Sequence, residues 1–275
     1  MDRVQTHRLF FAKLITANAG VAPGSELEAA LASTPREEFV GPPPWRIFTR
    51  SGYVESPADD PALLYQDVVV SLGGEGPFNN GQPSLHVFCL AALDLKRGER
   101  VVHVGAGTGY YTTLLAKLVG ETGVVDAYET VLEFARRATN NLAEFSYVTV
   151  HARSGAEGPL PECDVLYVNA GATEPLDVWL DALRPKGRLL FPMTPAEGAG
   201  GMLLITKQDD GGFAARFLLQ VQFVPCIGAR NEATAQRLSE AFRNSGWSKV
   251  KSLHQGEAVD ENCWFAGDGW WLSTK

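Results

Sequence analysis

The chain has 275 residues, of which 45% are hydrophobic and 20% are charged, and its formal net charge at pH 7 is −8. Such a composition is typical of a globular protein with enough apolar material for a sizeable core. The 24 basic residues stand against 32 acidic ones and form no run of Lys or Arg. Because a phosphate backbone would demand a basic stripe, we expect no nucleic-acid partner.

The sequence also argues against a membrane partner and a disulfide framework. The apolar segment 9–15 is far too short to span a membrane, and it contains Lys13. No two of the cysteines stand in a C-x-x-C spacing; they are Cys89, Cys163, Cys226 and Cys263. We expect reduced thiols, no metal site and a cytoplasmic location.

The first part of the chain is predicted to be helical. Ser25 followed by Glu28 is a capping box, and Thr34 followed by Glu37 predicts another, with a proline at the first helical position. The prolines at 42–44 end this region, and a loop-rich stretch follows to about residue 80. Four apolar residues near the start suit one face of a helix: Val4, Phe11, Leu14 and Ile15.

From there strands and helices alternate. The predicted helices cover residues 87–95, 110–119, 131–142 and 176–183. The predicted strands cover residues 100–105, 124–129, 147–153, 164–169, 188–192, 202–207 and 213–224. Continuous apolar strands alternating with amphipathic helices indicate a mostly parallel sheet that is covered on both faces. The Asp-Asp-Gly-Gly run at 209–212 predicts a hairpin, so we expect the last of the seven strands to be antiparallel.

The end of the chain differs from this pattern. Residues 232–244 predict a helix, and the aromatic-rich segment from Cys263 to Trp271 predicts a hairpin around a Gly-Asp-Gly turn. We expect these aromatic rings to pack on the core or on a partner subunit, with stacking on a ligand as the alternative. The expected organisation is an N-terminal helical and loop region (1–78), an α/β core (79–228) and a C-terminal helix-and-hairpin addition (229–275).

The segment from Val101 to Tyr110, V-V-H-V-G-A-G-T-G-Y, carries the strongest functional signal. A strand runs into a glycine-rich turn that opens a helix, so backbone can approach a ligand and free N–H groups can face a carboxylate. The spacing is G-x-G-x-G rather than the G-x-G-x-x-G of a dinucleotide site, and the absence of G-K-[ST] excludes a P-loop. Glu129 ends the next strand, where an acid can accept hydrogen bonds from two ribose hydroxyls. The alternative role of Glu129 is a solvated charge at a strand end.

Further segments stand in a fixed order around this turn: Pro35–Val40, Asn79–Pro83, Asp164–Ala170, Leu183–Leu189 and Phe223–Pro225. Together with the turn and Glu129, they resemble the protein-L-isoaspartate O-methyltransferases over about residues 30–228. The resemblance implies S-adenosyl-L-methionine (SAM) as methyl donor and a peptide or protein carboxylate as acceptor, as in protein repair. It also implies an α/β, Rossmann-like SAM-methyltransferase fold, with a doubly wound, mostly parallel seven-stranded sheet and an antiparallel last strand.

The resemblance also assigns site residues. The methyl-donor pocket falls on ten of them: Gly105, Ala106, Gly107, Thr108, Gly109, Tyr110, Glu129, Ser154, Gly155 and Asn169. His86 lies where the family carries a His near the methionine moiety, and its alternative role is that of a buried imidazole in the core. Asn80 and Gly81 fall at the methyl-transfer centre, as the catalytic positions.

Methyl transfer to a carboxylate requires no general base, because the sulfonium is already activated and the carboxylate is ionised at neutral pH. Catalysis then depends on positioning and on desolvation of the nucleophile. The absence of an obvious base dyad therefore agrees with a carboxyl methyltransferase. A hydroxyl acceptor served by His86 remains an alternative.

Two departures from the family pattern concern the acceptor and the adenine. The family usually has Ser or Thr where Gly81 stands, and Gly-Asp-Gly where this chain has Arg153-Ser154-Gly155. Three interpretations remain open: an isoaspartyl carboxyl methyltransferase, a methyltransferase for another small-molecule or peptide acceptor, and a SAM-binding protein without catalysis. If the backbone at Gly81 does not need a positive φ, Gly81→Ser is expected to raise turnover of an isoaspartyl peptide. The sequence gives neither the natural acceptor nor the oligomeric state.

Overall fold

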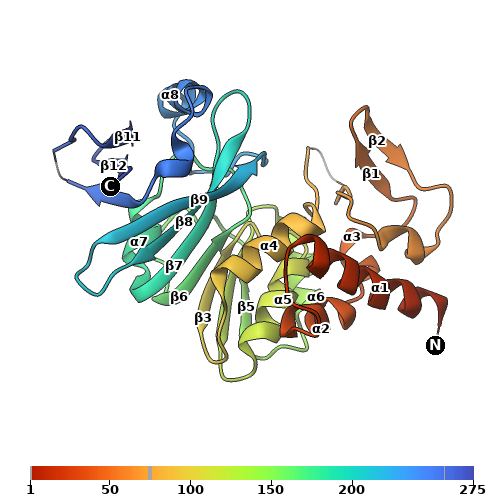
Figure 1. Cartoon of the computed structure of the whole chain (residues 1–275). Helices are drawn as coiled ribbons and strands as arrows, with labels where there is room; N and C mark the ends of the chain where they lie inside the picture. The colour runs from red at the N-terminus through yellow and green to blue at the C-terminus, as the bar shows by residue number, and fades with distance from the viewer. Residues whose placement is uncertain (1, 74–75, 257) are drawn as a thin grey trace. The chain divides into compact units, whose positions relative to one another are not determined.

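The computed structural model describes residues 2–73, 76–256 and 258–275, and the chain divides into two compact units. The first unit consists of Met1–Glu99 and Ala106–Ala152, and the second consists of Arg100–Gly105 and Arg153–Lys275. Both units combine helices with strands (Figure 1). The three-region division expected from the sequence stays a prediction.

The first unit contains most of the helices. They are α1 (Arg3–Asn18), α2 (Glu26–Ala32), α3 (Glu37–Val40), α4 (Pro83–Leu93), α5 (Tyr110–Val119) and α6 (Leu132–Asn141). Ser25 caps α2 as predicted, because its Oγ accepts a hydrogen bond from the Glu28 N–H at 3.2 Å. The prediction for Thr34 is wrong: its hydroxyl donates to the Ala30 carbonyl at 2.7 Å, and α3 has no side-chain cap. Thr34 thus ends one helix instead of beginning the next.

The N-terminal helix is present, but two of the four residues of its expected apolar face, Val4 and Leu14, are not buried. Phe11 and Ile15 are buried, whereas Leu14 is 39% exposed. Four residues on α1 are buried: Phe11, Ala12, Ile15 and Thr16. The buried face of α1 therefore includes Ala12 and Thr16, which directly follow Phe11 and Ile15, rather than Leu14.

The stretch predicted to be loop-rich contains a hairpin. Strand β1 (Arg46–Thr49) pairs antiparallel with β2 (Gly52–Glu55), and a short 3-10 helix, η1 (Pro61–Leu64), follows. Phe48 and Val54 on these strands are more than half exposed, so neither strand has the buried face that produces an alternating sequence. Residues 74 and 75 of this stretch lie outside the described residues.

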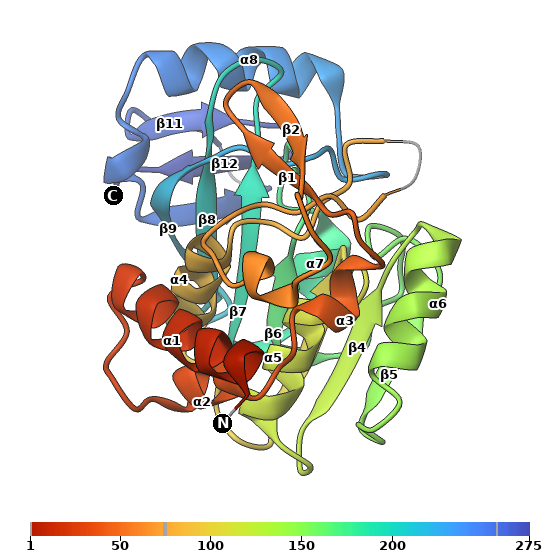
Figure 2. The same ribbon diagram turned by 90° about the vertical axis from the view of Figure 1, so that its right-hand side faces the viewer.

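The first unit also holds two of the predicted strands. Strand β4 (Val124–Tyr128) pairs in parallel with β5 (Val148–His151). Helix α6 connects them in the chain and lies beside them in Figure 2. This strand–helix–strand arrangement places Glu129 immediately after the end of β4.

The second unit is built around a sheet with the order β3-β6-β7-β8-β9-β10-β12-β11. Its strands are β3 (Arg100–Val104), β6 (Cys163–Val168), β7 (Leu183–Met193), β8 (Gly200–Lys207), β9 (Phe213–Val221), β10 (Ser252–Gln255), β11 (Cys263–Ala266) and β12 (Trp270–Ser273). The strands β3, β6 and β7 run parallel, with α7 (Asp177–Asp181) between β6 and β7. Strand β8, the sixth of the seven predicted strands, runs antiparallel to both β7 and β9, so β9 has the same direction as β7. The reversed strand is therefore the sixth and not, as was expected, the last.

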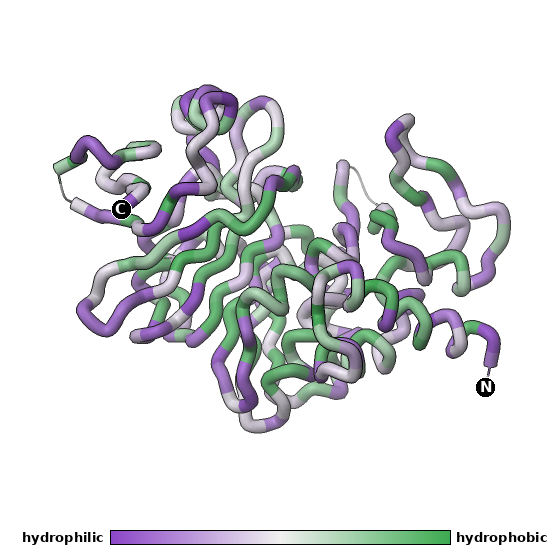
Figure 3. Tube along the Cα trace, in the orientation of Figure 1, coloured by the Kyte–Doolittle hydropathy of each residue, from purple (hydrophilic) through white to green (hydrophobic). Residues whose placement is uncertain are grey.

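The predicted hairpin between β8 and β9 is confirmed, because the Gln208 N–H donates to the Gly212 carbonyl at 2.7 Å. Figure 3 shows this turn as hydrophilic and the middle strands of the sheet as mostly hydrophobic. All residues of β6 except Asp164 are buried, which agrees with a central strand that is covered on both faces.

The C-terminal segment continues this sheet. Helix α8 (Glu232–Arg243) and the hairpin of β11 and β12 were predicted, whereas the four-residue strand β10, between β9 and β12, was not. Trp264 packs edge-on against Phe217 of β9 and Phe242 of α8, at ring-centroid distances of 5.3 Å in both cases. The expectation that the aromatic residues pack on the core is therefore confirmed for Trp264.

Candidate active site

The turn after β3 uses its glycines for backbone shape and for close packing. Gly105, Gly107 and Gly109 have φ angles of +77°, +56° and +95°, a region that favours glycine. A Cβ on Gly109 would lie 3.1 Å from Cδ1 of Leu142, so this glycine also lets α5 pack closely on the end of α6. The N-terminus of α5 has no side-chain cap. Its first N–H groups therefore remain available to an anionic ligand.

Glu129 is buried and bonded to the turn. It is 7% exposed, its Oε2 accepts from the Gly107 N–H at 2.7 Å, and its Oε1 accepts from the Val131 N–H at 2.9 Å. Burial raises the pKa of Glu129, and the backbone N–H bonds oppose that rise. Thr130 also donates to this carboxylate, through its N–H and its side chain, so the hydroxyls of a ribose would share the carboxylate oxygens with these donors. The alternative of a freely solvated strand-end charge does not agree with this burial.

The other side chains of the turn are engaged within the protein. The Thr108 hydroxyl donates to the Phe39 carbonyl at 2.6 Å, and the Tyr110 ring packs edge-on against the Phe39 ring at 5.4 Å. The Ala106 N–H donates to the Tyr128 carbonyl at 3.1 Å. These contacts fix the turn on α3 and β4, so Thr108 and Ala106 can offer a ligand mainly their remaining backbone groups.

The structure brings two predicted site residues, His86 and Gly81, into direct proximity. His86 on α4 is 2% exposed, and its ring stacks on Tyr111 at a centroid distance of 3.9 Å. Gly81 has a φ of +67°, and a Cβ added to it would lie 2.0 Å from Nε2 of His86. The imidazole thus occupies the space that any side chain at residue 81 would need.

Asn80 is held by a buried arginine. Its Oδ1 accepts from the Val70 N–H at 2.9 Å and from Nη2 of Arg36 at 3.4 Å, whereas its Nδ2 is buried without a partner. Arg36 is 0% exposed and donates to three backbone carbonyls, those of Leu64, Gln66 and Val68. The sequence singled out Arg36 only as part of the Pro35–Val40 segment and missed its role in holding Asn80.

In the second unit, Ser154 and Gly155 shape a turn after β5. The Ser154 hydroxyl donates to the Ile227 carbonyl at 3.3 Å and accepts from the Ala156 N–H at 3.1 Å. The Gly155 carbonyl accepts from Nε1 of Trp179 at 2.8 Å. The hydroxyl of Ser154 therefore has a structural role in addition to the expected role beside adenine.

Asn169 follows β6 and lies against the first glycine of the turn. Its N–H donates to the Val104 carbonyl at 2.8 Å, and a Cβ on Gly105 would lie 3.4 Å from the Asn169 carbonyl carbon. Its Nδ2 lies 2.8 Å from Nε2 of His103, a residue that the sequence analysis did not assign to the site. The only signal for His103 was its position within the strand that leads into the turn.

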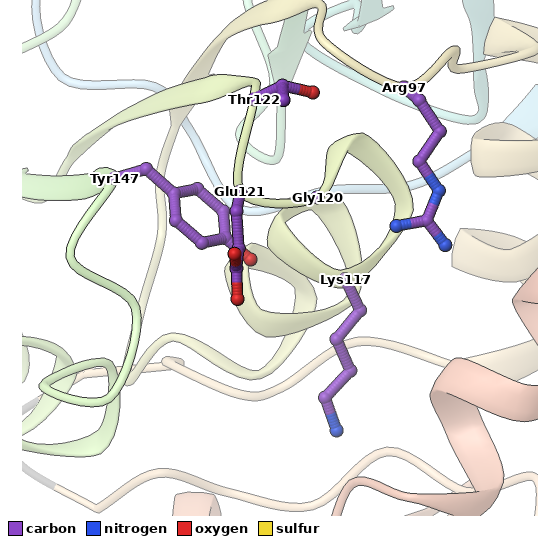
Figure 4. A pocket seen from close by; sticks show the side chains of 6 residues that line it. All are labelled: Arg97, Lys117, Gly120, Glu121, Thr122 and Tyr147. Atoms are coloured by element: carbon purple, nitrogen blue, oxygen red, sulfur yellow. The ribbon is translucent and has the colours of Figure 1, made fainter.

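A surface cavity of about 510 Å³ lies elsewhere in the first unit. Figure 4 shows the side chains that line it: Arg97, Lys117, Gly120, Glu121, Thr122 and Tyr147. These residues surround the C-terminal end of α5, whereas the glycine turn is at its N-terminal end. A ten-residue helix is about 15 Å long, so this cavity does not belong to the glycine-turn site. Among the described residues no group of three or more His, Cys, Asp and Glu is placed to hold a metal ion.

The comparisons with known proteins agree with this geometry. The model of the protein-L-isoaspartate(D-aspartate) O-methyltransferase family matches residues 11–231. The chain belongs to this family.

Two curated relatives in this family show the extent of the similarity. The protein-L-isoaspartate O-methyltransferase of Ignicoccus hospitalis is 29% identical over 212 residues, which cover 76% of this chain and 92% of the relative. That of Methanopyrus kandleri is 30% identical over 218 residues, which cover 76% of this chain and 86% of the relative. The family membership and the enzyme class predicted from the sequence, a methyltransferase, are thus confirmed.

Two solved structures support the fold. A protein-L-isoaspartate O-methyltransferase has a TM-score of 0.67 and 23% identity, covering 86% of this chain and 69% of its own. A putative protein-L-isoaspartate O-methyltransferase from Plasmodium falciparum, in complex with S-adenosyl-L-homocysteine, has a TM-score of 0.64 and 17% identity. It covers 80% of this chain and 98% of its own. The predicted Rossmann-like methyltransferase fold is confirmed.

Proposed function

We propose that this protein transfers a methyl group from S-adenosyl-L-methionine to an isoaspartyl or related carboxylate of a peptide or protein. The observation that carries the proposal is the buried contact between Glu129 and the glycine turn, at 2.7 Å from the Gly107 N–H. It combines an acid suited to a ribose diol with an uncapped helix N-terminus suited to a carboxylate. The membership of the chain in the family supports the same assignment.

Methyl transfer to a carboxylate requires the side chains mainly to position the donor and the acceptor. When bound, S-adenosylmethionine supplies a methyl group on an already activated sulfonium. An acceptor carboxylate is ionised near neutral pH, so the protein need not remove a proton. The turn and Glu129 hold the donor, while Asn80, Gly81 and His86 are the proposed boundary of the acceptor position. Exclusion of water from that position would strengthen the nucleophile.

A methyltransferase for a different acceptor is the second candidate. It is favoured by the geometry at Gly81, where the His86 imidazole fills the space in which the family places a hydroxyl-bearing side chain. An imidazole offers a different hydrogen-bonding surface from a hydroxyl, and it can also accept a proton from a hydroxyl acceptor. The acceptor class therefore depends on which chemical groups can hydrogen-bond to the His86 imidazole.

The decisive experiment is incubation with radiolabelled S-adenosylmethionine and an isoaspartyl peptide, followed by release of methanol in base. The peptide of identical sequence with ordinary aspartate is the matched substrate control. Base-labile label on the isoaspartyl peptide alone supports the proposal. Transfer only to other acceptors supports the second candidate, and tight donor binding without any transfer supports a non-catalytic role. Glu129→Ala should remove the label, and Glu133→Ala, on the exposed side of α6, should not.

We further propose that the protein acts in protein repair in the cytoplasm. None of the four cysteines, all of them described, forms a disulfide, which agrees with a reducing compartment. In the part of the chain that the structure describes, no helix is suited in length and hydrophobicity to cross a bilayer. The net charge of −8 argues against a nucleic-acid partner. Fractionation of cells that express the tagged chain tests the location.

A further inference from the structure

The hairpin of β1 and β2 belongs to a larger antiparallel ladder within the first unit (Figure 1). On the side away from β2, the Phe48 N–H of β1 donates to the Val69 carbonyl at 2.8 Å. The Ser71 N–H donates back to the Arg46 carbonyl of β1 at 2.9 Å. Strand β1 therefore lies between β2 and residues 69–71.

The ladder continues from there to the proposed acceptor position. Residues 70–72 are joined to residues 78–80 by two backbone hydrogen bonds of 3.0 Å and by an antiparallel bridge between Ser71 and Asn79. Oδ1 of Asn79 accepts a hydrogen bond from the Gly81 N–H at 2.9 Å. The ladder thus has the order β2, β1, 70–72 and 78–80, and it ends beside Gly81.

The register of the ladder divides its side chains between two faces. Ile47 stands opposite Val70 in one pairing and opposite Val54 in the other. Because successive residues of a strand point to opposite faces, Leu72 shares the face of Val70. Ile47, Val70 and Leu72 pack in one apolar cluster, whereas Val54, at the edge of this face, is 57% exposed. Cδ1 of Leu72 would lie 3.3 Å from a Cβ on Gly107, so this inner face also contacts the glycine turn.

The outer face of the ladder carries an aromatic pair. Phe48 is 52% exposed and stands opposite Tyr53, with the two rings edge-on at a centroid distance of 5.3 Å. The guanidinium of Arg46 lies over the Tyr53 ring at 5.0 Å. By the same alternation, Ser71 and Asn79 belong to this face. Aromatic and arginine side chains are the ones that most often contribute the binding energy of a protein interface.

We propose that this outer face binds the peptide segment that flanks the acceptor carboxylate, and that Phe48 and Tyr53 contact substrate residues about three or four positions from the acceptor residue. The inference rests on the proposed function, because it assumes a peptide acceptor beside Gly81. The occupant follows from the continuity of the ladder with that position. Two or three strand spacings of about 4.8 Å separate Asn79 from the aromatic pair, and an extended peptide rises about 3.3 Å per residue.

The test measures peptide binding by calorimetry on the protein saturated with S-adenosylhomocysteine, so that it does not depend on turnover. One ligand is an isoaspartyl tripeptide with capped ends. Two others extend it by about five residues, one on the amino side and one on the carboxyl side, with leucine three and four positions from the isoaspartate. One extended peptide should bind at least about fivefold more tightly than the tripeptide, as expected when interface aromatics become buried.

Phe48→Thr tests the aromatic pair, and Val54→Thr is the matched control. Both side chains are more than half exposed on the same hairpin, but they lie on opposite faces. Threonine keeps a high preference for strands at both positions, so the hairpin is retained. The affinity ratio between the extended peptide and the tripeptide should fall to about one in Phe48→Thr and keep its wild-type value in Val54→Thr. The affinity for S-adenosylhomocysteine reports an intact donor site.

Several results would overturn the inference. They are equal affinities for all three peptides, no binding of any peptide, a ratio that survives in Phe48→Thr, and a ratio that falls equally in Val54→Thr. A changed oligomeric state in Phe48→Thr, with the ratio intact, would assign the outer face to a second copy of this chain.

Failure of the proposed function gives a different result. Peptide binding with the expected ratio but without any methyl transfer would contradict the proposed function and leave this inference standing. If the wild type does not bind S-adenosylhomocysteine, the proposed donor is wrong, and the same three peptides are then compared on the free protein.

Discussion

The imidazole of His86 fills the space beside the Cα of Gly81, because a Cβ there would lie 2.0 Å from Nε2. Gly81 also has a φ of +67°, a conformation that is costly for any residue with a Cβ. The condition under which Gly81→Ser was expected to help is therefore not met. His86 cannot simply turn away, since its other side stacks on Tyr111 at 3.9 Å.

We therefore expect Gly81→Ser to lower kcat/KM and the affinity for S-adenosylhomocysteine at least tenfold, which corresponds to about 1.4 kcal/mol. Enzyme kinetics with the best acceptor, together with calorimetry, measure both effects. Gly24→Ser is the matched control, because Gly24 has a φ of +74° but open space around it. If the double variant Gly81→Ser/His86→Ala is more stable than Gly81→Ser alone, the loss in Gly81→Ser is caused by the clash between the side chain introduced at residue 81 and the imidazole. Unchanged or raised turnover in Gly81→Ser would contradict this account of the site.

Glu129 should make donor binding depend on pH. Burial raises the pKa of its carboxyl above the ordinary value of 4.5, and ribose hydroxyls form stronger hydrogen bonds with the ionised form. Affinity for S-adenosylhomocysteine should therefore rise with pH through this raised pKa and weaken below it. Calorimetry between about pH 4.5 and pH 8 measures the dependence. Glu129→Gln should remove it and lower affinity roughly 10- to 100-fold at neutral pH, because a charge-assisted hydrogen bond contributes about 1.5–3 kcal/mol.

The raised pKa of Glu129 also affects the stability of the free protein: its contribution to the free energy of unfolding should fall as pH rises, whereas donor affinity should increase. A carboxyl whose pKa is higher in the folded state stabilises the fold below its unfolded pKa, and this contribution is lost as pH rises through the folded value. Glu129→Gln should thus be at least as stable as the wild type at neutral pH in the absence of ligand. A variant that is less stable at pH 7 without ligand, yet binds S-adenosylhomocysteine normally, would assign Glu129 a purely structural role.

Arg36 should be among the most sensitive positions for stability. Its guanidinium is fully buried and satisfies the carbonyls of Leu64, Gln66 and Val68. Arg36→Met leaves these carbonyls and Oδ1 of Asn80 with fewer donors, so the free energy of unfolding should fall by about 3 kcal/mol or more. Thermal or urea denaturation measures the change.

Arg3→Met provides the control for Arg36→Met. The side chain of Arg3 is 65% exposed and forms an ion pair with Asp60 at the surface. Its removal should change stability by less than about 1 kcal/mol. Equal effects of the two substitutions would show that the buried hydrogen bonds of Arg36 do not hold this part of the fold.

The sequence predicts those elements whose signal is local. Most of the strands from β3 to β9 have largely apolar runs, and the turn before α5 has glycines at three alternating positions, Gly105, Gly107 and Gly109. The hairpin of β1 and β2 lacks a buried face, and β10 has four residues, so neither produces a pattern. The sequence predicts Thr34 as the N-cap of the following helix, but its hydroxyl instead donates to the Ala30 carbonyl of the preceding helix, α2.

The contacts within the site depend on tertiary packing and produce no local pattern in the sequence. The approach of His86 to Gly81 arises because Tyr111, from a different helix, stacks on the imidazole. Likewise, the pairing of His103 with Asn169 joins residues that are 66 positions apart. A motif gives the identity of such residues, but only the packing of the elements determines which of them meet.

The C-terminal addition should be required for an intact second unit. Truncation after Gly228 removes α8 and β10–β12, which leaves β9 as an open edge and uncovers Phe217. We expect aggregation or a lower melting temperature, measured by light scattering and calorimetry, and an equally stable, monodisperse product would contradict this. Trp264→Ala, which removes the ring that packs against both Phe217 and Phe242, should cost about 2 kcal/mol or more of unfolding free energy. Val259→Ala is the control, because Val259 is 56% exposed and its truncation should have little effect.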